Sequence, residues 1–168
     1  MRRNNKGFSY VELILVMAIM AIMIGVVTIS IGTVSRANIN RGAEKLESHL
    51  ERARSNSMAR GTDRGTLVLR CENGGYYAYI GDPASTDQEK ELLVSAASVT
   101  IGYYVNNGSD MVTLGNGDQL TIRYKASTGS FEPIAADSDE YCTSIVLMNG
   151  DKSRTVILHT ATGKCTLQ

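Results

Sequence analysis

The chain has 168 residues, which is enough for one domain and one long additional helix. Its 17 Lys and Arg residues balance its 17 Asp and Glu residues, so no net charge requires nucleic acid or an anionic surface as a partner. Sixteen glycines among many Thr, Ser and Asn residues are typical of a β-rich domain and argue against disorder.

An apolar run near the N-terminus is the most informative segment. Residues 13–27 contain no charged or polar side chain, and the first basic residue after them is Arg36. A bilayer takes roughly 20 helical residues to cross, so residues 11–34 are long enough to span it. The basic residues that precede the run predict a cytoplasmic N-terminus and export of the rest of the chain; they are Arg2, Arg3 and Lys6.

Glu12 interrupts an otherwise plain anchor. A carboxylate at full bilayer depth costs about 2.5–3.5 kcal/mol, and less near the interface, so this charge needs a partner. Cleavage between Gly7 and Phe8 would create one, the new α-amino group of Phe8. Within one helix the two charges are poorly placed, but staggered neighbouring helices could pair them. The sequence therefore predicts a helix that packs against copies or relatives of itself.

The combination of a short basic leader ending in Gly7, then Phe8, then Glu12 and an unbroken apolar run resembles the class III signal of type IV pilins and type II secretion pseudopilins. The resemblance implies cleavage after Gly7 by a prepilin peptidase, N-methylation of Phe8, and pairing of Glu12 with a neighbour's N-terminus. It also implies other pilin or pseudopilin subunits and a membrane assembly platform as partners. The expected location is the cytoplasmic membrane, then a cell-surface or periplasmic filament.

Two departures from the family pattern refine this expectation. Tyr10 and Val11 replace the commoner Thr-Leu pair, and the run lacks the proline of many major pilins, which favours a minor pilin or pseudopilin. The turns at Thr128-Gly129 and Thr162-Gly163, with the strands between them, resemble the β head of the H-type minor pseudopilin.

The helix should continue beyond the apolar run as an amphipathic helix. No proline occurs between Phe8 and Gly61, and Gly61 is a natural helix end, so roughly 50 residues form one helix of about 75 Å. Its second half has an apolar stripe at spacings of three and four, made of Ile39, Ala43, Leu46, Leu50 and Ala53.

After the helix the period becomes that of β-strands separated by Gly and Asn turns. The predicted strands are residues 66–71, 76–80, 99–105, 119–125, 144–148, 155–159 and a short one through Cys165 and Leu167. The predicted fold is α+β and pilin-like, with the amphipathic half of the helix on one face of an antiparallel sheet. Its predicted segments are a leader (1–7), a membrane-spanning helix half (8–35), an amphipathic half (36–61) and a β-rich head (62–168).

Three cysteines, Cys71, Cys142 and Cys165, allow three alternative single disulfides. Cys142–Cys165 is favoured because the two residues flank a predicted hairpin, although three reduced, buried thiols remain the alternative. No metal is predicted, because there is no C-x-x-C pair and His49 and His159 lie in unrelated segments.

The sequence contains no motif of an enzyme or of a cofactor site. His49 is expected on the wet helix face and His159 within a strand. The acidic residues 137–140 could attract calcium, but they match no EF-hand, and a solvated loop is expected. We therefore expect a protein that is not an enzyme and holds no cofactor.

Two alternative functions remain open: the first shares the filament mechanism and adds DNA binding, and the second differs in class. One is a DNA-uptake subunit, for which the sequence offers a basic bias between residues 52 and 70, from Arg52, Arg54, Arg60, Arg64 and Arg70. The other is an exported β domain on an uncleaved tether, which predicts a pocket of convergent polar groups in the head.

Overall fold

The structure is a computed structural model that describes residues 9–84 and 90–168, without the side chains of residues 25–35. Helix α1 (Tyr10–Arg60) is followed by a short 3-10 helix, η1 (Thr62–Gly65), and nine described strands. The chain forms two compact units, Met1–Ser35 and Arg36–Gln168, and each is described here by itself.

Helix α1 agrees with the predicted helix at both ends. The carbonyl of Ser9 accepts bonds from the amides of Glu12 and Leu13, at 3.0 and 3.2 Å, so the helix begins directly after Ser9. At the other end the amide of Gly61 still bonds to Ser57, and Gly61 then turns away at a φ of 97°. A residue without Cβ takes that backbone angle at little cost, which is why the helix ends there.

The first part of α1 is apolar, which raises the question of whether it spans a membrane. Among the residues that the structure describes, no helix combines the length and the apolarity needed to cross a bilayer. The predicted membrane-spanning segment, residues 8–35, extends into residues outside this description and stays a prediction.

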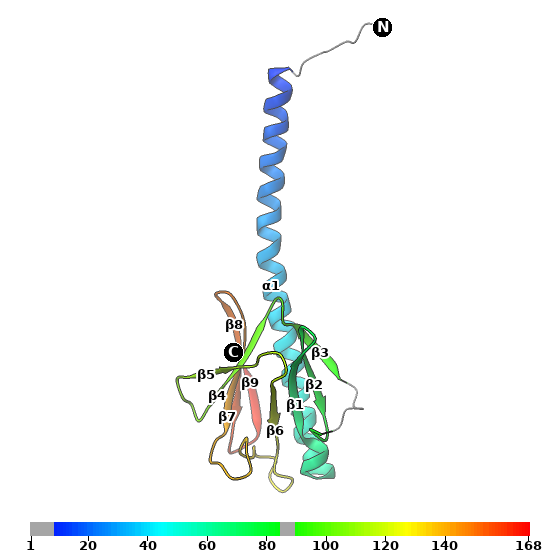
Figure 1. Ribbon diagram of the computed structural model, residues 1–168, viewed down its shortest axis with the longest axis vertical. Coiled ribbons are helices and arrows are strands. Elements are labelled where there is room, and N and C mark those ends of the chain that lie inside the picture. Colours follow the sequence, from blue (N-terminus) through cyan, green and yellow to red (C-terminus); the bar gives the residue numbers. More distant parts are fainter. Residues whose placement is uncertain (1–8, 85–89) are drawn as a thin grey trace. The chain divides into compact units, whose positions relative to one another are not determined.

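The strands form two antiparallel sheets in the second unit (Figure 1). One has the order β3-β2-β1-β6, from Glu91–Ser95, Gly75–Ile80, Leu67–Glu72 and Gln119–Ile122. The other has the order β5-β4-β7-β8-β9, from Met111–Thr113, Thr100–Val105, Cys142–Asn149, Lys152–His159 and Lys164–Leu167.

The sheet arrangement corrects two sequence predictions. The head has two sheets where one was expected, and β3 and β5 fall in segments for which no strand was predicted. Strand β3 escapes prediction because Leu92, Leu93 and Val94 are consecutive apolar residues without the alternation of a strand exposed on one face. Strand β5 has three residues, too few to show a period.

Tight turns set the register of the two long hairpins. Between β1 and β2, Asn73 and Gly74 both have positive φ, 49° and 74°, which is the backbone of the two-residue turn that matches strand twist. Asn149 pairs with Lys152 across the equivalent turn between β7 and β8.

The core lies between the second half of α1 and both sheets. All five residues of the predicted stripe, Ile39, Ala43, Leu46, Leu50 and Ala53, are buried. Tyr124 locks the helix to the head: its hydroxyl donates to the carbonyl of Leu50 at 3.0 Å, and its own carbonyl accepts from Ser57 Oγ at 2.7 Å. Its ring packs on Phe131 with centroids 4.6 Å apart. The α+β architecture, a helix packed on antiparallel sheets, is therefore confirmed.

Candidate assembly site and the surfaces of the head

The predicted processing site lies partly outside the described residues. Gly7 and Phe8 belong to the segment that is not described, whereas Glu12 lies in the first turn of α1 and is exposed. A carboxylate in this turn interacts favourably with the amide-rich end of the helix, by about 0.3–1 kcal/mol when exposed. Glu12 therefore has a local role besides any role between subunits.

The surface of residues 10–24 is apolar on every side. All of these residues are exposed, and Glu12 is the one charged residue among them. Exposed fractions of the large side chains range from 45% for Val16 to 80% for Tyr10. An apolar helix with no buried face of its own must find that face in lipid or in another protein.

The sequence analysis missed one feature at this end of the helix. Ser9 and Glu12 have the S-x-x-E spacing of a capping box, in which a serine just before the helix and a glutamate three residues later satisfy the first free amides. The backbone bonds of Ser9 place it at the cap position. The S-x-x-E spacing of Ser9 and Glu12 would have predicted from the sequence that α1 begins directly after Ser9.

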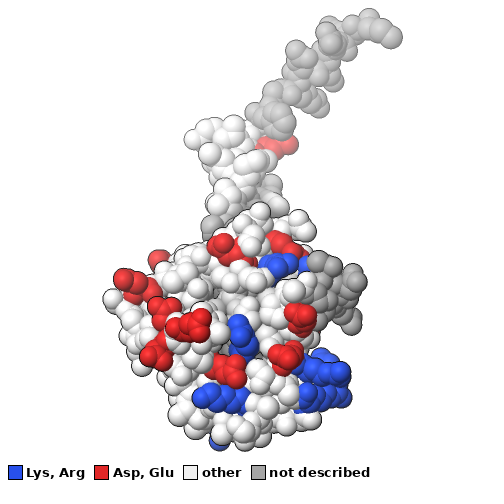
Figure 2. Space-filling model, turned by 60° about the horizontal axis from the view of Figure 1, so that its bottom comes forward, with Lys and Arg blue, Asp and Glu red and all other residues white. Residues whose placement is uncertain are grey.

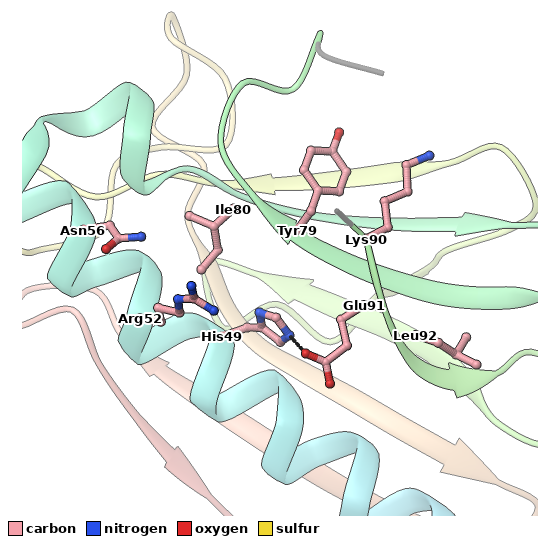
Figure 3. Close-up of a pocket in the computed structure, with 8 residues that line it drawn as sticks. All are labelled: His49, Arg52, Asn56, Tyr79, Ile80, Lys90, Glu91 and Leu92. Carbon is pink, nitrogen blue, oxygen red and sulfur yellow. Dashed lines mark hydrogen bonds and ion pairs between the residues drawn. The ribbon is translucent and has the colours of Figure 1, made fainter. Parts of the chain in front are cut away.

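The tethered-domain hypothesis predicts a pocket of convergent polar groups, and one recess of the head has polar groups in its lining. It has a volume of about 620 Å³ and lies between α1 and strands β2 and β3 (Figure 3). Its lining residues are His49, Arg52, Asn56, Tyr79, Ile80, Lys90, Glu91 and Leu92, and none of them is a serine or cysteine that could act as a nucleophile.

An ion-pair cluster beside this recess engages two of its polar residues, His49 and Glu91. His49 Nε2 lies 3.1 Å from Glu91 Oε2, and Lys45 Nζ lies 2.9 Å from Glu91 Oε1. Lys45 also donates to the carbonyl of Leu92 at 3.1 Å. In Figure 3 the hydroxyl of Tyr79 points away from the imidazole–carboxylate pair. Together these contacts tie the edge strand β3 to α1.

The two histidines have different surroundings. The side chain of His49 is 12% exposed, so the expectation of a solvated residue is wrong, because Glu91 and the edge of the sheet cover it. His159 lies in β8 as expected, and its ring contacts Thr166 Oγ1 at 3.1 Å.

The cysteines are free thiols, and the predicted Cys142–Cys165 disulfide is absent from the structure. Cys142 begins β7 and Cys165 lies in β9, with β8 between them. Two strand spacings separate such residues by about 9–10 Å, more than the roughly 7 Å that a disulfide spans. Burial raises the pKa of the Cys142 thiol to about 12 and that of Cys165 to about 11. Both thiols therefore stay protonated and poorly reactive at neutral pH.

Two of the five arginines considered for DNA binding, Arg54 and Arg70, are engaged by contacts within the head. Arg54 donates to the carbonyl of Gly129 at 3.0 Å, and Arg70 donates to Gln119 Oε1 at 2.6 Å. On the face that Figure 2 shows, acidic and basic side chains are interspersed. The contacts of Arg54 and Arg70 serve the head itself.

The described residues contain no cluster of three or more His, Cys, Asp or Glu side chains placed to hold a metal ion. Within the acidic loop, Asp137, Asp139 and Glu140 are exposed. The backbone carbonyl of Asp139 accepts a bond from Asn106 at 3.1 Å.

Comparison with known proteins bears on the N-terminal segment. Residues 2–28 match the prokaryotic N-terminal methylation motif, which includes Gly7, Phe8 and Glu12. Neither curated proteins nor solved structures give a match to the chain. The H-type subgroup is therefore not confirmed. The matched motif supports the resemblance of the N-terminal segment to the signal of type IV pilins and pseudopilins.

Proposed function

We propose that this chain is a non-catalytic minor pilin or pseudopilin, assembled into a filament of a type IV pilus or a type II secretion system through residues 8–35 after cleavage at Gly7. Before assembly the apolar segment holds the subunit in the cytoplasmic membrane, with the head outside. The partners are other pilin-like subunits, the prepilin peptidase, the assembly platform and, before assembly, membrane lipid.

One observation carries this proposal: the methylation motif at residues 2–28 contains a helical segment, residues 10–24, whose side chains are all exposed. Residues 10–24 bury nothing within the described chain, whereas residues 36–60 bury a complete stripe against the head. A head that already has its own core does not need the first segment for stability. The apolar segment therefore has surface available for lipid and for neighbouring helices.

Processing is tested by mass spectrometry of the intact protein and its N-terminal peptide from its native membrane. The expected mature chain begins at N-methylated Phe8. Gly7→Ala should leave the precursor uncut, because the peptidase reads the glycine before the cleavage site. A chain that still begins at Met1 in cells with active prepilin peptidase would favour the tethered β domain instead.

Assembly is tested separately with Glu12→Ala, which should be cut normally but enter filaments poorly. Because Glu12 also stabilises the start of α1, the matched control is Ser9→Ala, which removes the cap hydroxyl and keeps the carboxylate. Incorporation is measured as the ratio of filament-bound to membrane-bound subunit. Normal incorporation of Glu12→Ala would contradict the pairing of Glu12 with a neighbour's N-terminus.

A further inference from the structure

A basic recess is formed partly by the first residues of the second unit, which begins at Arg36. Its volume is about 370 Å³. The first turn of the unit contributes Arg36, Ile39 and Asn40, and the turn between β7 and β8 contributes residues 151–154. Residues more than a hundred positions apart in sequence thus form one surface.

Positive charge dominates the lining of this basic recess. Arg36, Lys152 and Arg154 are basic, and Asp151 is the one acid among the lining residues. Arg36, Asp151 and Arg154 are exposed. In the described part of the chain no salt bridge joins Arg36 or Arg154 to a carboxylate.

A hydrogen bond holds the two halves of the basic recess together. Arg154 Nε donates to Asn40 Oδ1 at 2.9 Å and so ties the β7–β8 turn to α1. This bond uses one of the several N–H donors that a guanidinium carries in a planar fork. A fork held in this way suits the oxygens of a phosphate group.

The position of the basic recess in the chain suggests which molecules lie close to it. Arg36 directly follows Ser35, the last residue of the unit that contains the apolar segment. If that segment lies in a membrane, the basic recess lies within a few residues of the headgroup region, where phosphates are concentrated.

We infer that the basic recess binds the phosphate of an anionic phospholipid headgroup on the outer surface of the cytoplasmic membrane and holds the head there until assembly. The inference rests on the proposed function for the membrane location of residues 8–35. Each Lys or Arg near an anionic membrane strengthens binding about fivefold, which corresponds to about 1 kcal/mol. Loss of two of the three cations should therefore weaken headgroup binding by more than tenfold.

The test uses the full chain in lipid nanodiscs with a phosphatidylglycerol analogue that carries a photoactivatable group beside its phosphate. Cross-links to the peptide containing residues 151–154 are quantified by mass spectrometry. A phosphatidylcholine analogue with the same photoactivatable group is the control. Its headgroup has no net charge, so it measures labelling that comes from closeness to the membrane alone. We expect the phosphatidylglycerol analogue to label this peptide severalfold more than the phosphatidylcholine analogue, and added salt to remove the difference.

Three variants test the charge of the basic recess. Lys152→Gln with Arg154→Gln should remove the preference for phosphatidylglycerol. Asp151→Asn removes the one acid from the lining and should increase the preference, and it leaves the Arg154–Asn40 bond in place. The matched control is Arg60→Gln with Arg64→Gln, two exposed arginines outside the lining of the basic recess, which should change nothing.

Equal labelling by the two lipids, or a preference insensitive to both the double substitution and Asp151→Asn, would overturn the inference. A chain that does not enter nanodiscs would overturn it as well. The N-terminal mass answers a different question, because a chain that is never cut after Gly7 can still show the lipid preference. Failure of the proposed function and failure of this inference are therefore distinguishable.

Discussion

The two ends of α1 differ both in the residues that they contain and in how those residues are buried. In residues 10–24 every described side chain is exposed, although nearly all are apolar. In residues 36–60 a narrow stripe is buried, and charged side chains such as Arg41, Glu44 and Glu51 lie exposed between its members.

This difference shows which apolar surface of α1 is buried within the chain and which is not. The second segment meets two sheets through its buried stripe, a tyrosine bond to the helix backbone and an ion-pair cluster. The first segment has apolar surface in every direction and one carboxylate. The lipid or protein groups that cover this surface and pair with the carboxylate must therefore come from outside the chain. Substitutions in the two segments should therefore affect different measurements.

The largest expected effect separates the two segments most clearly. Leu46→Ala removes a side chain that is 0% exposed and leaves a cavity between α1 and the sheets, which should lower the free energy of unfolding by about 2–5 kcal/mol. Thermal or denaturant unfolding of the head measures it. The same substitution at Leu15, which is 59% exposed, should leave head stability unchanged. Equal destabilisation by both would show that the first segment also packs within the chain.

Gly65→Ala tests how closely the chain returns to α1 after the helix ends. A Cβ on Gly65 would lie 2.5 Å from the carbonyl oxygen of Ala53 and closer still to the amide nitrogen of Ser57, so backbone has to move. The expected loss of stability is about 1–3 kcal/mol in a denaturant titration. Gly115→Ala is the control, because the nearest atom there is a movable carboxylate oxygen of Asp118 at 3.3 Å. Wild-type stability of Gly65→Ala would mean that the chain turns more loosely.

The buried stripe could be predicted from sequence because its spacing depends on the helix alone. The ends of α1 were predictable for the same reason, since Gly61 and the absence of proline act locally. The division into two sheets was not, because it depends on which strand pairs with β1 and which with β7, and strand period does not encode the partner.

The contacts that join helix and head were also hidden from the sequence. Tyr124 lies 74 residues from the carbonyl it binds, and Glu91 lies 42 residues from His49. At the N-terminus the opposite holds. The motif around Gly7, Phe8 and Glu12 was recognisable because it is contiguous, and it is the part that the match at residues 2–28 supports.

Tyr124→Phe measures one polar contribution to the packing of the second segment. It removes the bond to Leu50 but keeps the ring against Phe131, so the expected loss is about 1 kcal/mol. Burial raises the pKa of Tyr124 above its ordinary value of 10, so wild-type stability should fall as the pH rises above 10. In Tyr124→Phe, the part of this fall in stability above pH 10 that comes from ionisation of the Tyr124 phenol should be absent.

Tyr104→Phe is the control for the phenol. Tyr104 is half-buried in β4 on the opposite sheet face from Ile101, and its substitution should change stability little. A loss as large as that of Tyr124→Phe would mean that the cost comes from the phenol in general and not from its bond to the helix.

The smallest expected effect concerns the ion-pair cluster that ties β3 to α1. The ammonium of Lys45 lowers the pKa of Glu91, and His49 adds to the effect. A lowered pKa means that the folded state favours the carboxylate, so this stabilisation is complete above the ordinary value of 4.5 and is lost as the pH falls through the lowered value. Because Glu91 is half exposed, the gain at neutral pH should be under about 1 kcal/mol.

Glu91→Gln should therefore lower stability slightly at pH 7, and the difference from wild type should disappear in acid as the wild-type carboxylate is protonated. Added salt should reduce the difference at pH 7, because solvent-exposed ion pairs are screened. Glu44→Gln is the control, because Glu44 is an exposed carboxylate on α1 that takes part in none of the described salt bridges, and it should change stability less at pH 7. A difference that stays constant across this pH range would assign the effect to the shape of the Glu91 side chain and not to its charge.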